Sequence, residues 1–158
     1  MLDPASIHLV PLAARPELAP AVQAWFEAEW PGHYGPDGPG DAAADLRAYT
    51  RARGLPMGWV ALVDAQARGF AALKTEPFAG HPAPGPWVGA ALVQPAWRGR
   101  GIGAVLISGL EKAARAGGIA QLHSATATSA RLLERLGWQR IDTVMHAGTP
   151  TDIYRKTL

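Results

Sequence analysis

The segment Val93-Gln94-Pro95-Ala96-Trp97-Arg98-Gly99-Arg100-Gly101-Ile102-Gly103 decides how this chain is interpreted. It follows an almost wholly apolar stretch, residues 87–93, which predicts a central strand covered on both faces, and it precedes an amphipathic helix that starts at Ile102. Glycines at such a turn let the backbone approach a ligand, and the amides of a helix N-terminus carry partial positive charge. The segment therefore predicts a phosphate or pyrophosphate site, to which Arg98 and Arg100 add full positive charges.

Two other phosphate-binding motifs and a turn without any ligand are the alternatives. Residues 99–104 also fit the relaxed dinucleotide pattern G-x-G-x-x-A, but that motif needs its first Gly directly after the strand and an acidic residue about 20 positions later. Five residues separate Val93 from Gly99, and the next expected strand ends in His123-Ser124. No Gly-Lys-Ser or Gly-Lys-Thr occurs, which excludes a P-loop.

Apolar periodicity and turn residues predict alternating helices and strands along the rest of the chain. Residues 31–40 and 77–86 are rich in Pro and Gly and predict loops, and residues 64–69 are expected to link two strands of a hairpin. This order predicts an α/β (α+β) fold in which a mixed sheet of about seven strands is flanked by about four helices. The expected strands are 7–12, 57–63, 70–73, 87–93, 119–123, 138–145 and 152–154, and the expected helices are 16–30, 41–54, 102–116 and 128–136.

Composition narrows the function classes. The 158 residues are 48% apolar and 18% charged, so we expect residues 1–158 to fold as one domain. The net charge is only +2 with basic residues spread along the chain, which disfavours nucleic acid as a partner. The absence of Cys excludes disulfides and a cysteine acyl-enzyme, and the five His residues show no spacing typical of a metal site. Without a leader or a long apolar run, we expect a cytoplasmic protein that does not enter a membrane.

Two blocks of the sequence resemble the GNAT superfamily of N-acetyltransferases. The pattern Arg, two spacers, Gly, one spacer and Gly in residues 98–103 is similar to the acyl-CoA signature of that family, including the Val-x-Pro-x-x-Arg-Gly that leads into it. The second block is Ala130-Arg131-Leu132-Leu133-Glu134-Arg135-Leu136-Gly137-Trp138, which resembles the family's helix-then-strand segment.

The resemblance implies a GNAT fold and acetyl-CoA as the acyl donor. The main-chain amides of residues 98–103 would then bind the pyrophosphate, and the pantetheine would run between the strands that contain Val93 and His123, next to the backbone of Leu92 and Val93. A backbone N–H at the end of the first strand would polarise the thioester carbonyl, a contact of the oxyanion-hole type. The family also implies a possible homodimer.

The catalytic acid and base depart from the family pattern. Many relatives place a Tyr where this chain has Leu133, so the usual acid for the departing thiolate is missing, and water would have to supply the proton. Residues 87–93 contain no Glu or Asp to serve as base. His123 is the first candidate base, with a packed or solvated His as the alternative, and Glu76 is the second, with a solvated loop carboxylate as the alternative.

These features predict an acetyl-CoA-dependent N-acyltransferase that moves an acetyl group to a primary amine of a small molecule or peptide, by direct transfer in a ternary complex. Trp30, His33 and Tyr34 lie where the family borders the acceptor site, although a surface loop is an equal interpretation. Acidic residues favour a cationic acceptor, namely Glu29, Asp37, Asp41 and Glu76. A non-catalytic acyl-CoA-binding protein and a nicotinamide-dependent oxidoreductase are the rival hypotheses.

Overall fold

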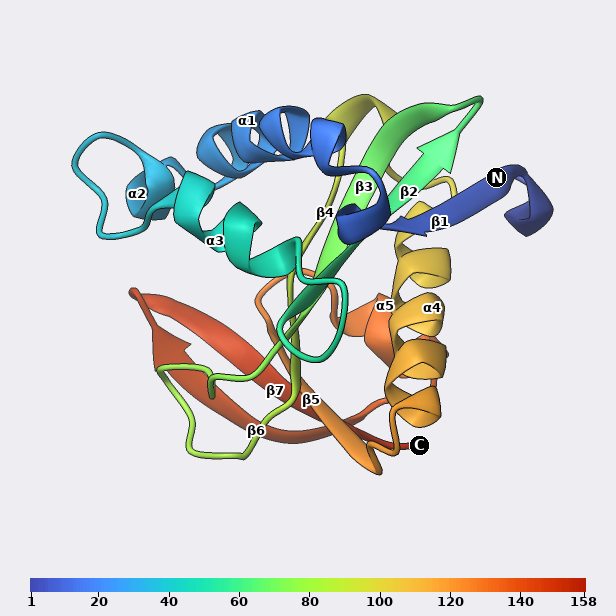
Figure 1. Ribbon diagram of the computed structural model, residues 1–158. Helices are drawn as coiled ribbons and strands as arrows, with labels where there is room; N and C mark the ends of the chain where they lie inside the picture. The colour runs from blue at the N-terminus through green and yellow to red at the C-terminus, as the bar shows by residue number, and fades with distance from the viewer.

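Seven strands form one sheet in the order β1-β2-β3-β4-β5-β7-β6 in the computed structural model, which describes residues 1–158 (Figure 1). Every neighbouring pair is antiparallel except β4 and β5, which are parallel, so the sheet is mixed as the sequence predicts. The strands are β1 (Ile7–Pro11), β2 (Met57–Val63), β3 (Gln66–Lys74), β4 (Trp87–Val93), β5 (Gln121–Thr126), β6 (Gln139–His146) and β7 (Thr149–Thr157).

Helices cover both faces of the first half of the sheet. Figure 1 shows α1, α2 and α3 on one side of strands β2 to β4 and α4 on the other. The helices are α1 (Ala19–Glu29), α2 (Pro31–Tyr34), α3 (Ala42–Tyr49), α4 (Ile102–Ala116) and α5 (Ala130–Arg135), and short 3₁₀ turns lie at Pro4–Ser6, Leu12–Ala14, Pro16–Leu18 and Pro95–Trp97. None of these helices combines the length and the apolar character that a membrane crossing requires.

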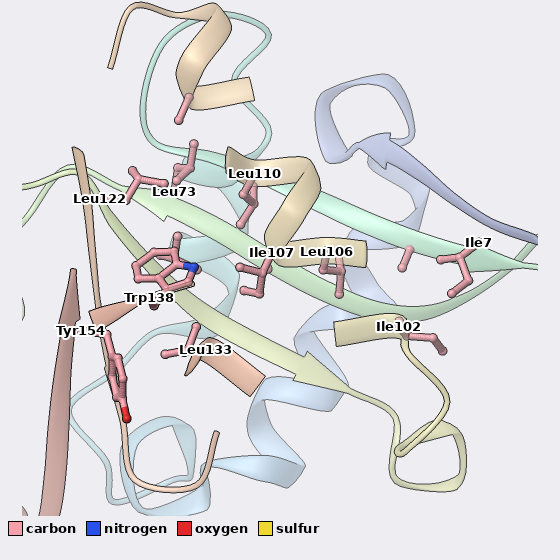
Figure 2. Close-up of a cluster of buried hydrophobic side chains, with 14 of the residues drawn as sticks. Ile7, Leu73, Ile102, Leu106, Ile107, Leu110, Leu122, Leu133, Trp138 and Tyr154 are labelled. Atoms are coloured by element: carbon pink, nitrogen blue, oxygen red, sulfur yellow. The ribbon is translucent and has the colours of Figure 1, made fainter. Parts of the chain in front are cut away.

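Two apolar clusters pack on opposite faces of the central strands. Alternate residues of β2 divide between them: Ala61 and Val63 join the cluster under α4, whereas Val60 and Leu62 join the cluster under α1 and α3. Burial on both faces explains why this strand is a continuous apolar run. Figure 2 shows the α4 cluster, with four side chains of that helix among its members: Ile102, Leu106, Ile107 and Leu110.

The central position of β4 confirms the sequence prediction, but its expected burial is wrong at one position. Trp87 and Val88 are buried, whereas Ala91 is exposed. The reason is that β5 pairs with only the first residues of β4 and then turns away from it. The second half of β4 therefore lacks a strand neighbour on that side.

The hairpin of β2 and β3 is confirmed, with a much shorter link than the sequence suggests. Only Asp64 and Ala65 form the turn, with φ of 51° and 63°, as in the two-residue turns that match the twist of antiparallel strands. β3 consequently starts at Gln66 and not at residue 70. The polar stretch belongs to the strand because its side chains lie next to the turn, where Gln66 is exposed to water.

Four further element boundaries differ from the prediction. Residues 31–34 form the one-turn helix α2 and not a loop, because Pro31 stands at its first position, where no N–H is needed. The helix expected over 41–54 is α3 and ends at Tyr49. β5 covers Gln121–Thr126 where residues 119–123 were expected, and β7 covers Thr149–Thr157 where residues 152–154 were expected. The two strands pair with each other from Gln121 with Thr157 to Thr126 with Asp152, which sets these bounds. There are thus five helices where about four were expected.

Candidate functional site

An opening in the sheet lies where β4 and β5 part. The parallel pairing covers only Trp87 with His123 and Val88 with Ser124. At this last pair the buried Ser124 donates a hydrogen bond from Oγ to the carbonyl of Val88, at 3.0 Å. From Gly89 onward β4 has no partner on the β5 side, so its backbone edge is available to a ligand.

A bulge interrupts β4 beside this opening. Phe70 of β3 pairs with Leu92, but Ala72 pairs with Gly89, so β4 has one residue more than its partner between these two pairs. Ala90 takes a φ of 50°, which is uncommon for a residue with a side chain. The bulge leaves part of the backbone between Gly89 and Leu92 out of the regular ladder, next to Leu92 and Val93, beside which the resemblance puts the pantetheine.

The glycine loop (residues 98–103) follows at the end of β4 and leads into α4. Gly99 and Gly101 have φ of 75° and 91°, in the left-handed region that favours glycine. The N–H groups of six consecutive residues, 99–104, donate to no acceptor in the protein, and the N-terminus of α4 has no side-chain cap. Six free amides at the start of a 15-residue helix form a site for an anion.

Arg98 forms two hydrogen bonds outside the loop. Its Nε donates to the carbonyl of Val93 at 2.9 Å, and its Nη2 donates to Oε2 of Glu29, at the end of α1, at 2.8 Å. The charge of Arg98 is thus paired with Glu29 in this structure, and its contribution to a phosphate site stays a prediction. Arg98 ties α1 and the end of β4 to the loop, and both Arg98 and Arg100 are exposed.

Arg68 joins the site from β3, which the sequence motifs do not reveal. Its guanidinium carbon lies 4.4 Å from the centroid of the Trp97 ring, which Arg100 also approaches, at 4.7 Å. Arg68 Nη1 donates to Oε1 of Gln94 at 3.1 Å. Because Arg68 is 30 positions from the loop, only its pairing within the sheet brings it there; no local signal in the sequence identifies it.

Two other residues of the loop serve packing as well as backbone geometry. A Cβ on Gly103 would lie 3.2 Å from Cδ2 of Leu132, so glycine here allows α5 to approach α4 closely. Ile102 is 1% exposed and belongs to the core, so that it can offer a ligand only its amide. Leu2 also reaches the loop, where its N–H donates to the carbonyl of Arg100 at 3.1 Å.

His123, the first candidate base, lies at the closed end of the opening and is 4% exposed. Its ring centroid is 5.3 Å from that of Trp87, and its Nδ1 is buried without a hydrogen-bond partner. Burial lowers the pKa of His123 below its ordinary value, so that the imidazole is neutral near pH 7 and able to accept a proton. Packing against Trp87 separates it from bulk water.

The segment between β3 and β4 lies next to His123 and contains Glu76, the second candidate base. Within it, Nε2 of His81 lies 3.0 Å from Oδ2 of Asp142 on β6, and Nε1 of Trp87 donates to the carbonyl of Ala83 at 3.0 Å. Glu76 itself is exposed and forms no ion pair. The structure therefore does not bring the two candidate bases into one hydrogen-bonded group.

Leu133 lies in the core and not at the opening. It is 3% exposed and belongs to the cluster under α4, where Figure 2 shows it beside Trp138 and Tyr154. The Tyr154 hydroxyl donates to Oε1 of Glu134 at 2.8 Å, and burial together with this bond raises its pKa to about 12. α5 thus presents no side-chain hydroxyl of its own at the position where relatives carry their acid.

The candidate acceptor residues form an aromatic layer on α1 and α2. Trp30 and Tyr34 each lie 5.4 Å from the ring of Phe26, and the exposed His33 packs edge-on against Tyr34 at 4.5 Å. They are therefore held by packing and do not form a free loop. A hollow of about 170 Å³ adjoins this layer at the end of β4, and it is lined by Trp25, Ala28, Glu29, Leu92, Gln94 and Pro95. Trp25 is thus only partly buried and lines a surface hollow.

The four acidic residues expected near the acceptor have different roles. Glu29 is paired with Arg98, and Oδ1 of Asp41 caps α3 by accepting from the N–H of Ala44 at 3.0 Å. Asp37 and Glu76 are exposed without partners. No group of three or more His, Asp or Glu side chains is placed so that it could hold a metal ion.

Solved structures with the same fold are numerous among acetyltransferases. A GCN5-related N-acetyltransferase from Kribbella flavida superposes with a TM-score of 0.76 at 20% identity, covering 99% of this chain and 100% of that chain. The aminoglycoside 6'-N-acetyltransferase from Enterococcus faecium gives 0.74 at 15% identity, covering 95% and 96%. A Salmonella typhimurium protein described as an acetyltransferase and solved with its cofactor acetyl-CoA gives 0.74 at 20% identity, covering 97% and 94%. At these identities the likeness establishes the fold alone.

The sequence itself matches a family model. No curated protein matches significantly. The model of the acetyltransferase (GNAT) family, in contrast, matches residues 19–138, from the start of α1 to Trp138. This span contains β4, the glycine loop, α4 and α5, and it is well over half of the chain. The chain therefore belongs to the GNAT family of acetyltransferases.

Proposed function

We propose that this protein transfers the acetyl group of acetyl-CoA to a primary amine of a small molecule or peptide. The free amides of residues 99–104 carry the proposal, because six unpaired donors at a helix N-terminus fit a pyrophosphate. The neighbouring opening between β4 and β5 supplies a path for the pantetheine toward the bulge at Ala90, next to Leu92 and Val93. The GNAT family of the chain makes acetyl-CoA the expected donor.

The reaction is a direct transfer in a ternary complex. The amine nitrogen attacks the thioester carbonyl, so that a C–N bond forms and the C–S bond breaks, and the chain has no Cys to form an acyl-enzyme. A backbone N–H of the bulged part of β4 stabilises the oxyanion. The thiolate takes its proton from water, because Leu133 offers none.

His123 is the proposed base, with Glu76 as the alternative. The support for His123 is an unpartnered Nδ1 at the closed end of the opening and a pKa lowered by burial. A neutral imidazole near pH 7 is able to take the proton that the acceptor ammonium must lose, either directly or through water. Glu76, in contrast, is an exposed carboxylate without an ion-pair partner.

The distribution of charge agrees with an anionic donor and a cationic acceptor. Nine of the 13 acidic residues precede Arg98, and five of these lie in residues 19–49, which form α1, α2 and α3. Nine of the 15 Lys and Arg residues lie at or after Arg98. The name of the Enterococcus faecium neighbour, an aminoglycoside 6'-N-acetyltransferase, adds support for a small-molecule amine as acceptor.

The test begins with thermal unfolding of the protein with and without excess acetyl-CoA, using NADH as control. A ligand at 100 times its Kd stabilises the folded state by about 2.7 kcal/mol, which is a rise of several degrees in Tm for a domain of this size. We expect the rise with acetyl-CoA alone, followed by release of free CoA thiol when amines are added. No rise with acetyl-CoA would contradict the proposal.

A non-catalytic acyl-CoA-binding protein is the second candidate function. The position of Leu133 in the core and the burial of His123 favour it, since both usual proton-transfer roles then lack an accessible side chain. Stabilisation by acetyl-CoA without thiol release on any amine of a broad panel is the result that would establish this alternative.

A further inference from the structure

A polar hollow lies at the end of β7, at the other end of α4 from the glycine loop. Its volume is about 530 Å³, and none of its lining residues is hydrophobic; they are Gln121, Gly137, Gln139, Arg155, Lys156 and Thr157. Figure 1 shows the C-terminal end of β7 beside the last turn of α4, whereas the glycine loop precedes the first turn. Because the 15 residues of α4 span about 22 Å, this β7 hollow is separate from the candidate donor site.

Strand register brings four of the lining side chains together on one face of the sheet. Arg155 of β7 is paired with Gln139 of β6, and Thr157 of β7 is paired with Gln121 of β5. Residues paired across neighbouring strands, and residues two apart in one strand, project from the same face. Leu122 follows Gln121 and belongs to the cluster under α4, so the four side chains lie on the opposite face.

The four side chains have no partner within the protein. None of them forms a hydrogen bond or an ion pair. Lys156, in contrast, is held by the carboxylate of Glu111 and by the carbonyl of Leu136. The half-buried Arg155 therefore lines the β7 hollow with all five N–H donors of its guanidinium free.

No acidic side chain on this face is available to offset the charge of Arg155. Asp142 shares the face, since it is paired with Ile153, two positions before Arg155. Its carboxylate, however, is bonded to Nε2 of His81, at 3.0 Å. On the β5 side Arg155 is paired with His123, whose Nδ1 is buried without a hydrogen-bond partner. The surroundings of Arg155 thus lack a negatively charged acceptor, which a bound anion would supply.

We propose that the β7 hollow binds a small oxyanion, a ligand that carries a carboxylate or a phosphate group. The guanidinium of Arg155 presents a planar fork that matches two oxygens of either group. Gln121 and Gln139 add amide donors from the strands on either side of β7, and the hydroxyl of Thr157 adds another donor. This site goes beyond the proposed function, because none of these four residues belongs to the candidate active site.

The experiment is a titration of the isotope-labelled full chain with sodium phosphate and, separately, with sodium citrate, followed by the backbone amide NMR signals. Sodium chloride keeps the ionic strength constant, so that general screening does not change. The wild type is compared with Arg155→Gln and with Gln139→Ala, which removes one donor at an exposed position. Arg131→Gln is the matched control, because Arg131 is an exposed arginine of α5 without an ion-pair partner.

We expect the amide signals of the four residues to shift and to saturate with both anions, in the wild type and in the control. Arg155→Gln should raise Kd about tenfold or more, because it removes the charged donors, and Gln139→Ala should raise it about threefold. The anion with the lower Kd identifies the source of the oxyanion as a phosphate or a carboxylate ligand. Because Gln139→Ala leaves Arg155 in place, it tests the site even where Arg155→Gln disturbs the fold.

Two results would overturn the site: shifts at the four residues that stay linear up to the highest anion concentration, or saturating shifts that both variants leave unchanged. Phosphate bound at the free amides of residues 99–104 would move a different set of signals, which Arg155→Gln should not alter. The outcome for the β7 hollow is therefore independent of whether the protein transfers acetyl groups.

Discussion

Gly101 shows how much of the donor site depends on single residues. Its φ of 91° excludes ordinary side chains without strain, and it immediately precedes Ile102, the first residue of α4. We expect Gly101→Asp to abolish the rise in Tm with acetyl-CoA, because a carboxylate among the free amides would both occupy and repel the pyrophosphate site. Gly54→Asp is the matched control, since Gly54 also has a positive φ, of 74°, but has open space around it. Equal loss in both variants would contradict a specific site at the loop.

His123 supports a prediction about rate and pH. His123→Ala should lower kcat by about a hundredfold or more while leaving acetyl-CoA stabilisation in place, because general base catalysis typically contributes this factor. Because burial lowers the pKa of His123, the neutral form persists below the usual value near 6.5, so kcat/KM for the wild type should fall only in more acidic solution. An unchanged rate in His123→Ala with a true acceptor would leave Glu76 as the candidate to test.

At the scale of elements, α5 is held by its packing against α4. Leu133 faces the cluster that contains Ile107 and Trp138, and Gly103 allows the neighbouring Leu132 to come close to α4. Leu133→Tyr, which restores the family's usual residue, should therefore destabilise the protein by about 1–3 kcal/mol, because a larger ring and a hydroxyl enter a filled core. Urea unfolding measures this, with Arg131→Tyr at an exposed position of the same helix as control. A stable variant with faster turnover would show that the core admits the ring toward the opening.

The candidate site lies where β4 and β5 separate. Only two residue pairs join the strands, and the Ser124 hydroxyl bonds to Val88 at the point where they part. The glycine loop begins five residues after Val93, the last residue of β4. The free amides and the open edge of β4 are therefore consecutive along the chain. One continuous stretch of backbone can therefore contact both ends of a long donor molecule.

For the whole molecule, the arrangement of layers separates the two proposed substrates. Residues 19–49, which form α1, α2 and α3, bring five of the 13 acidic residues to one side of the sheet, whereas the loop and α4 bring an uncapped helix N-terminus to the end of β4 (Figure 1). The Glu29–Arg98 pair is the side-chain contact that joins these two parts, at 2.8 Å. Both side chains are substantially exposed, so its contribution to stability is small, at most about 1 kcal/mol, and its effect is to orient Arg98.

The sequence by itself determined the order of elements, the central place of β4, the glycine loop and the family. Each of these follows from the local periodicity of apolar residues or from motifs whose residues are close together in the chain. Tertiary structure alone decided the exposure of Ala91, the contact of Arg68 with Trp97 and the turning of Arg98 toward Glu29. It also decided that Leu133 and His123 are buried. These features depend on strand register, on a bulge and on packing between residues far apart in the chain, and no local pattern encodes such distances.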